Sequence, residues 1–261
     1  MKGDFDLLIK AIPGNDDITL YPISDLHIGA SEFMQQKWND FKNKIAKEPN
    51  SYLLLGGDLC NNATRSSVSN IFEETMRPKE QKRWLVEEFT PLRDKILCAV
   101  SGNHCRRSEK DADDNPMYDV MCKLDLEDIY QKDIAFLKIQ IGNTKENGTR
   151  NPTYTIAVTH GAGGGIYTGA AVNRNERFQY VIDGLDCLVV GHTHKGVISK
   201  PQKIKIDPFN NRVTFSQCVV VSSTSWMQFG GYALQKMLIP ASNDLQTIVL
   251  KGNKKQIVAN W

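Results

Sequence analysis

The sequence predicts an α/β protein in which two mixed β-sheets pack face to face and helices cover their outer faces. Apolar runs of strand length alternate with helical segments in the first half of the 261-residue chain, and strands predominate from about residue 196. Several runs are apolar at every position, which is typical of strands buried on both faces. No linker separates the two halves, so we expect a single domain over residues 1–261.

The first half of the chain is predicted to contain three strands and four helices. Each strand is a short apolar run that ends near Gly, Ser or Asp, and the three cover 18–23, 52–55 and 96–100. The helices are expected at 34–47, near 65–76, from Pro78 onwards and near 117–130. The charged stretch 106–116 between them is predicted to be a surface loop.

The second half is predicted to be rich in strands. These are expected near 134–141, 153–159, 185–190, 203–206, 212–221, 232–239 and 247–250. One polar helix is expected near 174–182, after the glycine-rich segment 161–165. Those glycines would contact a phosphate, act as a lid, or form a plain flexible loop.

Composition excludes several classes of protein. Hydrophobic residues make up 41% and charged residues 24%, which excludes disordered and fibrous chains. No apolar stretch approaches the roughly 18–20 residues of a membrane span, and acids interrupt the N-terminal segment, so neither insertion nor export is expected. Six scattered cysteines suggest free thiols in the cytoplasm. A net charge of +2 does not by itself indicate a nucleic-acid partner.

The five histidines follow a pattern. Each lies just after a predicted strand, beside an acid, an asparagine, a glycine or another histidine, in the blocks Ser24-Asp25-Leu26-His27, Gly102-Asn103-His104, Thr159-His160 and Gly191-His192-Thr193-His194. A further block, Gly56-Gly57-Asp58, follows another strand. None of the histidines falls in a predicted helix. Any one block has a plainer interpretation as a turn or a packed residue, but the five together indicate one site.

The donor types in these blocks indicate a metal site. Strand ends of an α/β sheet converge on one edge, so side chains from five strands are able to share a pocket. Imidazole, carboxylate and amide donors suit Mn, Fe or Zn better than calcium, which prefers oxygen alone. Seven or eight donors exceed one tetrahedral site, whereas two metals sharing a bridging carboxylate would use them all. Such a site is suited to displacement at phosphorus.

The order of the blocks, Asp-x-His, Gly-Asp, Gly-Asn-His, His and Gly-His-x-His, resembles the calcineurin-like metallophosphoesterase superfamily over residues 25–194. The resemblance implies a four-layer αββα sandwich and attack by a metal-bound hydroxide without a covalent enzyme intermediate. It implies that Asp58 bridges two metals. The other implied ligands are Asp25, His27 and His194 for one metal and Asn103, His160 and His192 for the other. The resemblance also implies that His104 protonates the leaving oxygen or stabilises the transition state.

Two departures from the superfamily pattern bear on function. Cys105 stands where many members have an acid that orients the histidine. Leu59-Cys60-Asn61-Asn62 lacks the acid–arginine pair of the protein phosphatases, which argues against a protein serine/threonine phosphatase. Nearby, Arg106 and Arg107 would be either phosphate contacts or solvated loop charges. Trp226, with residues 229–232, would be either a base-stacking wall or part of the core.

We therefore expect a cytoplasmic, two-metal phosphoesterase that hydrolyses phosphodiesters of nucleotides or nucleic acid, as in the nuclease and phosphodiesterase branches. Two divalent ions are expected, with Mn²⁺ first and Fe, Zn or Ni as the other candidates. The expected partner is a phosphate-ester substrate, and no association with a membrane is expected. The oligomeric state stays open. The alternatives are a phosphomonoesterase for a small metabolite and a non-catalytic scaffold on the same fold. Retention of every ligand favours catalysis.

Overall fold

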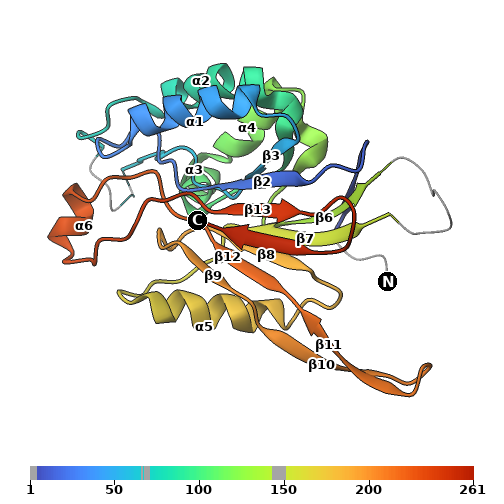
Figure 1. Cartoon of the computed structure of the whole chain (residues 1–261). Coiled ribbons are helices and arrows are strands. Elements are labelled where there is room, and N and C mark those ends of the chain that lie inside the picture. The colour runs from blue at the N-terminus through green and yellow to red at the C-terminus, as the bar shows by residue number, and fades with distance from the viewer. Residues whose placement is uncertain (1–4, 66, 68–70, 143–150) are drawn as a thin grey trace.

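The computed structural model describes residues 5–65, 67, 71–142 and 151–261 and contains two six-stranded sheets packed face to face (Figure 1). In the first sheet the order is β14 (Ile257–Asn260), β13 (Thr247–Leu250), β2 (Ile18–Ile23), β3 (Ser51–Leu55), β4 (Ile96–Val100) and β5 (Tyr130–Gln131). Strands β2 to β5 are parallel to one another, and β13 runs antiparallel to β2 and β14. The sheet is therefore mixed.

The second sheet is also mixed. Its order is β1 (Leu7–Ile12), β6 (Ile134–Ile141), β7 (Thr153–Thr159), β8 (Cys187–Val190), β12 (Val219–Ser222) and β9 (Val197–Ser199). Strands β7, β8 and β12 are parallel, whereas β6 and β9 run antiparallel to their neighbours β7 and β12.

Helices cover the outer faces of the two sheets, so the molecule has the predicted αββα layers (Figure 1). The first sheet is covered by α1 (Gln35–Lys47), α2 (Pro78–Phe89) and α4 (Pro116–Lys123), with α3 (Asn103–Ala112) beside them. The second sheet is covered by α5 (Thr168–Gln179). Two 3₁₀ segments, Thr90–Lys95 and Glu127–Ile129, and the short helix α6 (Gly231–Gln235) complete the helical elements of the described residues. None of the described helices has the length and apolarity needed to cross a membrane.

Burial on both faces explains the continuously apolar strands. Leu53 and Leu55 of β3 face the helices, in a core that includes Trp38 and Phe89. Leu54, between them, faces the second sheet and belongs to the core between the sheets. Successive side chains of a strand point to opposite faces, so a strand with a hydrophobic core on each side must be apolar at every position.

Most of the charged stretch 106–116, predicted to be a surface loop, is helical: the prediction was wrong for residues 106–112, while 113–115 connect two helices without regular structure. Residues 103–112 form α3, in which His104, Cys105 and Ser108 face the interior while charged side chains occupy the solvent face. The helix ends at Asp113, whose backbone is left-handed and whose N–H donates to the Glu109 carbonyl. Dense charge therefore marks the solvent face of an amphipathic helix here.

Other predicted elements differ in detail. The described residues of the helix expected near 65–76 form turns and bends instead, and the Thr75 N–H donates to the Gly29 carbonyl; residues 66 and 68–70 of that prediction lie outside the described residues. The strand expected at 232–239 is replaced by α6 and irregular chain. The strand expected at 212–221 breaks at Cys218 into β11 (Arg212–Gln217) and β12. Trp226 is fully buried against Trp38 and Phe41, so it belongs to the core rather than to a stacking wall.

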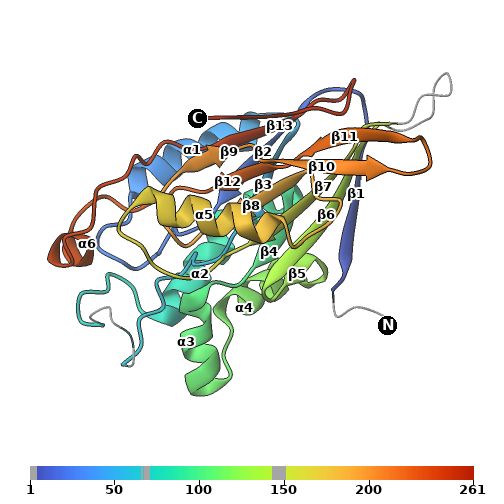
Figure 2. The ribbon, with the colours of Figure 1, turned by 90° about the horizontal axis from the view of Figure 1, so that it is seen from below.

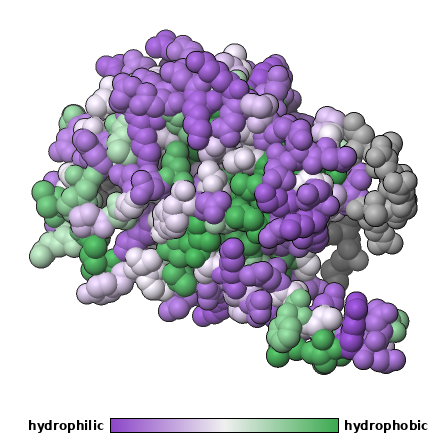
Figure 3. Space-filling model, in the orientation of Figure 1, coloured by the Kyte–Doolittle hydropathy of each residue, from purple (hydrophilic) through white to green (hydrophobic). Residues whose placement is uncertain are grey.

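A two-stranded ribbon projects from the second sheet (Figure 2). It consists of β10 (Gln202–Asp207) and β11 in antiparallel pairing. Hydrophobic side chains gather on it, and they belong to the exposed residues Ile204, Ile206, Phe209, Val213 and Phe215 (Figure 3).

Candidate metal centre

All eight predicted site residues lie in segments that follow the carboxyl ends of five strands. Asp25 and His27 follow β2, Asp58 follows β3, Asn103 and His104 follow β4, His160 follows β7, and His192 and His194 follow β8. Contrary to expectation, Asn103 and His104 lie in a helix, because they form the first turn of α3. The structure brings all eight side chains together where the carboxyl ends of β2, β3 and β4 in the first sheet meet those of β7 and β8 in the second.

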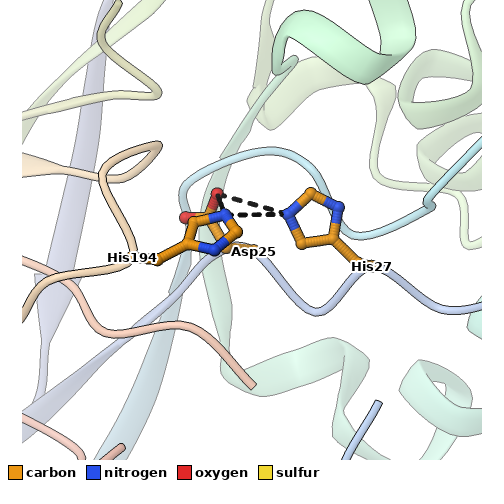
Figure 4. A group of neighbouring side chains, drawn as sticks. All are labelled: Asp25, His27 and His194. Carbon is orange, nitrogen blue, oxygen red and sulfur yellow. Dashed lines mark hydrogen bonds and ion pairs between the residues drawn. The ribbon is translucent and has the colours of Figure 1, made fainter. Parts of the chain in front are cut away.

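The first group of donors consists of Asp25, His27 and His194 (Figure 4). The Nε2 atoms of the two imidazoles lie 3.0 Å apart, and Asp25 Oδ1 lies 3.2 Å from that of His194 and 3.7 Å from that of His27. Asp25 is fully buried, and its Oδ1 has no hydrogen-bond partner among the described residues. A buried carboxylate oxygen without a hydrogen bond, facing two imidazole nitrogens, fits a cation between the three side chains.

The second group consists of Asp58, His160, His192 and Asn103. His160 Nε2 lies 3.0 Å from both Asp58 Oδ2 and Asn103 Oδ1. His192 Nδ1 lies 2.7 Å from the same Asn103 oxygen and 3.3 Å from His160 Nε2. His160 Nδ1 contacts the Gly56 carbonyl at 2.9 Å, a contact that holds the ring with Nε2 facing the group. Two nitrogens and two oxygens therefore converge on one point.

Asp58 connects the two groups. One of its carboxylate oxygens lies within 4.8 Å of a His27 nitrogen, and the carboxylate is also part of the group with His160 and His192. It is 2% exposed, and its Oδ2 lies 3.0 Å from His160 Nε2 and 3.8 Å from His104 Nε2. This position between the groups is the one that a bridging carboxylate needs.

Unusual backbone conformations cluster at these residues. Asp25, His27, Asp58, His192 and His194 all have positive φ, between 50° and 71°. Non-glycine residues rarely adopt this left-handed region, and several neighbouring instances are typical of functional sites, where surrounding structure maintains the strain. The backbone is therefore shaped to aim these side chains inward.

Charge interactions within the site shift several pKa values. Burial alone would raise the pKa of Asp58, but the imidazoles of His104 and His160 outweigh it and lower that pKa. Burial opposes the charged form of His160, yet the carboxylates of Asp58 and Asp25 raise its pKa to about 9. Burial lowers the pKa of His104 to about 3. Without metal, His160 therefore carries a proton that a metal ion must displace.

His104 is held in one orientation by backbone groups. Its N–H donates to Asp58 Oδ1 at 2.8 Å, and its Nδ1 lies 2.6 Å from the Asn61 carbonyl, which only accepts, so Nδ1 carries the proton. Nε2 then faces the site, 3.8 Å from Asp58 Oδ2. Cys105 does not replace the expected acid, because it is buried in the core beneath the helices, where burial raises the pKa of its thiol to about 12.

A polar network behind His104 was not predicted from the sequence. Asn61 donates to Glu74, Gln81 donates to Glu74 at 2.6 Å, and the Asn62 N–H donates to Gln81 Oε1 at 2.9 Å. Gln81 is fully buried although it is polar. The network fixes the loop whose Asn61 carbonyl orients His104. The only sequence signal was the pair Asn61-Asn62 after the Gly-Asp block.

Comparison with known proteins agrees with the motif order. The family model for calcineurin-like phosphoesterases matches residues 18–196, which include all eight site residues. No protein with curated annotation matches. Three of the solved structures that match this chain follow, and each shares little sequence with it.

The first of these is Vps29 of Chaetomium thermophilum, at 12% identity, covering 93% of this chain and 96% of that one with a TM-score of 0.39. Pseudomonas putida nuclease MPE has 15% identity, 92% and 87% coverage and a TM-score of 0.36. The calcineurin-like phosphoesterase YfkN of Bacillus subtilis has 11% identity, 90% and 85% coverage and a TM-score of 0.36. With the family model covering the segment that carries every motif, the chain belongs to the calcineurin-like phosphoesterases, a family of dinuclear metal-dependent phosphoester hydrolases.

Proposed function

We propose that this metal-dependent phosphoester hydrolase acts on phosphodiesters of nucleotides or nucleic acid. The observation that carries the proposal is the convergence of a complete donor set beside an oriented histidine, His104, whose Nε2 faces the site. The absence of the acid–arginine pair after Asp58 disfavours a protein phosphatase and supports the diesterase reading.

The proposed ligands follow the two groups. Asp25, His27 and His194 would hold one ion, while Asn103, His160 and His192 would hold the other. Asp58 would contact both. The mixed nitrogen and oxygen donors favour Mn²⁺, with Fe, Zn or Ni as the other candidates.

The residues of the chain would share the chemistry as follows. Two bound divalent ions would supply positive charge to the phosphoryl oxygens and lower the pKa of an attacking water. His104 would act on the leaving oxygen through Nε2, while the Asn61 carbonyl holds the protonated Nδ1. The His104 pKa of about 3 leaves Nε2 without a proton in the free protein, so the ring would take up a proton from solvent as the anionic phosphate binds and then pass it to the leaving oxygen. The His104 N–H would keep the Asp58 carboxylate in place through its 2.8 Å hydrogen bond.

We also propose a reducing, cytoplasmic location. All six cysteines are free thiols in the structure, and five of them are buried. This usage is typical of proteins that fold without disulfides.

The test compares hydrolysis of bis-p-nitrophenyl phosphate and p-nitrophenyl phosphate, each with added Mn²⁺ and with chelator. Metal-dependent cleavage of the diester is expected, and His104→Ala should lose most turnover, about 100-fold or more, while keeping its metals. Cleavage of the monoester alone would replace the proposal with a metabolite phosphatase. Two bound metals without cleavage of either ester would favour a scaffold.

A further inference from the structure

Two consecutive arginines follow the Gly-Asn-His block, and the structure gives them different surroundings. Arg106 is exposed, and its guanidinium pairs with the Asp133 carboxylate at 2.7 Å. Arg107 is half-buried, and its Nη2 lies 3.0 Å from Nε2 of His104, one helical turn earlier on α3. Only Arg107 is therefore part of the surroundings of the site.

Within the part of the chain that the structure describes, Arg107 is a cation without a paired carboxylate. Among the described residues, no carboxylate oxygen lies within 4.0 Å of its guanidinium, and its other recorded contact is a long one, 3.5 Å, to Ser67 Oγ. The two acids that act on it from further away are Asp58 and Glu74. Asp58 already accepts from His104 and faces His160, and Glu74 already accepts from Asn61 and Gln81.

A half-buried guanidinium without a counter-charge is costly to maintain in a folded protein. Its five N–H donors form a planar fork that matches two oxygens of a phosphate. Its two recorded contacts to described residues, Ser67 and His104, involve only part of this fork. The position is therefore suited to an anion that arrives from outside the chain.

We propose that Arg107 binds a non-bridging phosphate oxygen of the substrate, beside the leaving oxygen that His104 faces. The proposal rests on the proposed function, because it takes His104 as the residue that contacts the leaving oxygen. Arg107 Nη2 now lies within hydrogen-bond distance of His104 Nε2, so a leaving oxygen that approaches this nitrogen comes close to the guanidinium as well. The guanidinium would therefore exchange the imidazole nitrogen for an oxygen of the same phosphate.

The test uses the Mn²⁺-loaded protein and three variants: Arg107→Ala, Arg107→Lys and the matched control Arg106→Ala. Calorimetry measures binding of inorganic phosphate, and kcat/KM is measured for bis-p-nitrophenyl phosphate. We expect Arg107→Ala to weaken phosphate binding and to lower kcat/KM about 100-fold. Arg107→Lys should lose about 10-fold because it keeps the charge without the fork. Arg106→Ala should match the wild type in both assays.

Added guanidinium should restore part of the activity of Arg107→Ala. It should not raise the activity of the wild type, Arg107→Lys or Arg106→Ala. Unchanged phosphate binding in both Arg107 variants, or an equal loss in Arg106→Ala, would overturn the proposal. If Arg107→Ala does not fold, Arg107→Lys alone tests the proposal. Phosphate binding by Arg107→Lys as tight as that of the wild type would contradict a role for the planar guanidinium. If the wild type cleaves no diester, the proposed function fails, while the phosphate titration still decides the role of Arg107.

Discussion

The backbone N–H of His104 donates a 2.8 Å hydrogen bond to Asp58 Oδ1, so the proposed acid and the proposed bridging carboxylate have a fixed separation. This bond requires the glycine before Asn103. A Cβ on Gly102 would lie 2.0 Å from Asp58 Oδ1, which is far closer than any real contact. The Gly-Asn-His block therefore needs its glycine for space, because the extended backbone at Gly102 is open to any residue.

Gly102→Ala is expected to break this arrangement. The new methyl group would displace a buried carboxylate, with a loss of about 2–3 kcal/mol of unfolding free energy and weaker metal binding. Urea unfolding and metal analysis check both effects. Gly169→Ala is the control, because its Cβ meets nothing within 4 Å in α5, and it should be neutral or stabilising by about 0.5–1 kcal/mol. Equal stability of Gly102→Ala and the wild type would show that the site tolerates movement of Asp58.

Asp58→Asn is expected to lower occupancy of both metals at once. The amide keeps the shape of the side chain and still accepts from the His104 N–H, so the change removes mainly the charge that two ions would share. Elemental analysis after dialysis should give fewer than one tightly bound ion per chain. Asp133→Asn, outside the site, should leave two. Two tightly bound ions in Asp58→Asn would mean that the ligand assignment is wrong.

The fold was largely predictable because burial leaves a direct trace in the sequence. A run such as 52–55 has to be apolar at each position, since Leu54 enters one core and its neighbours enter another. The same logic failed for 103–112, where charge on the solvent face of α3 obscured the few inward residues. Local composition therefore failed where the charge of one helix face outweighed the few apolar residues of the other.

The donor set of the site was predictable because its residues stand next to strand ends in a fixed order. The hydrogen bonds that orient them were not, since they depend on segments distant in sequence, as when Asn61 meets His104. The sequence also treated Arg106 and Arg107 alike. Adjacent helical positions point about 100° apart, so only the packing of α3 separates a surface ion pair from a site residue.

Gln81→Ala is expected to disturb His104 without touching a proposed ligand. The buried amide of Gln81 donates to Glu74 and to the Met76 carbonyl and accepts from the Asn62 N–H, so its loss leaves buried polar groups without partners. We expect about 2–3 kcal/mol of destabilisation and a lower kcat with metal content unchanged. The exposed Gln35 of α1 gives the control, since Gln35→Ala should cost under about 0.5 kcal/mol. Loss of metal from Gln81→Ala would show that the network supports the ligands instead.

Stability of the metal-free protein is expected to fall as the pH rises above neutrality. The folded state raises the pKa of His160 from 6.5 to about 9 through the carboxylates of Asp58 and Asp25, so it binds this proton more tightly than the unfolded chain does. The resulting stabilisation is complete below pH 6.5 and is lost as the pH rises through 9. Its size is about 3 kcal/mol, from 1.36 kcal/mol per pKa unit.

Thermal unfolding of the chelated protein between pH 6 and 8 checks this expectation, because at higher pH the raised pKa values of buried thiols such as Cys98 and Cys105 add a decline of their own. The Tm should decline from pH 6.5 to 8, and His160→Gln should remove most of the decline over this interval because an amide does not titrate. The raised pKa of His194 acts in the same direction and should leave a smaller residual slope. With Mn²⁺ bound the decline should disappear or reverse, because a coordinated imidazole carries no proton on its ligating nitrogen. An equally steep decline in His160→Gln would assign the lost proton to another group.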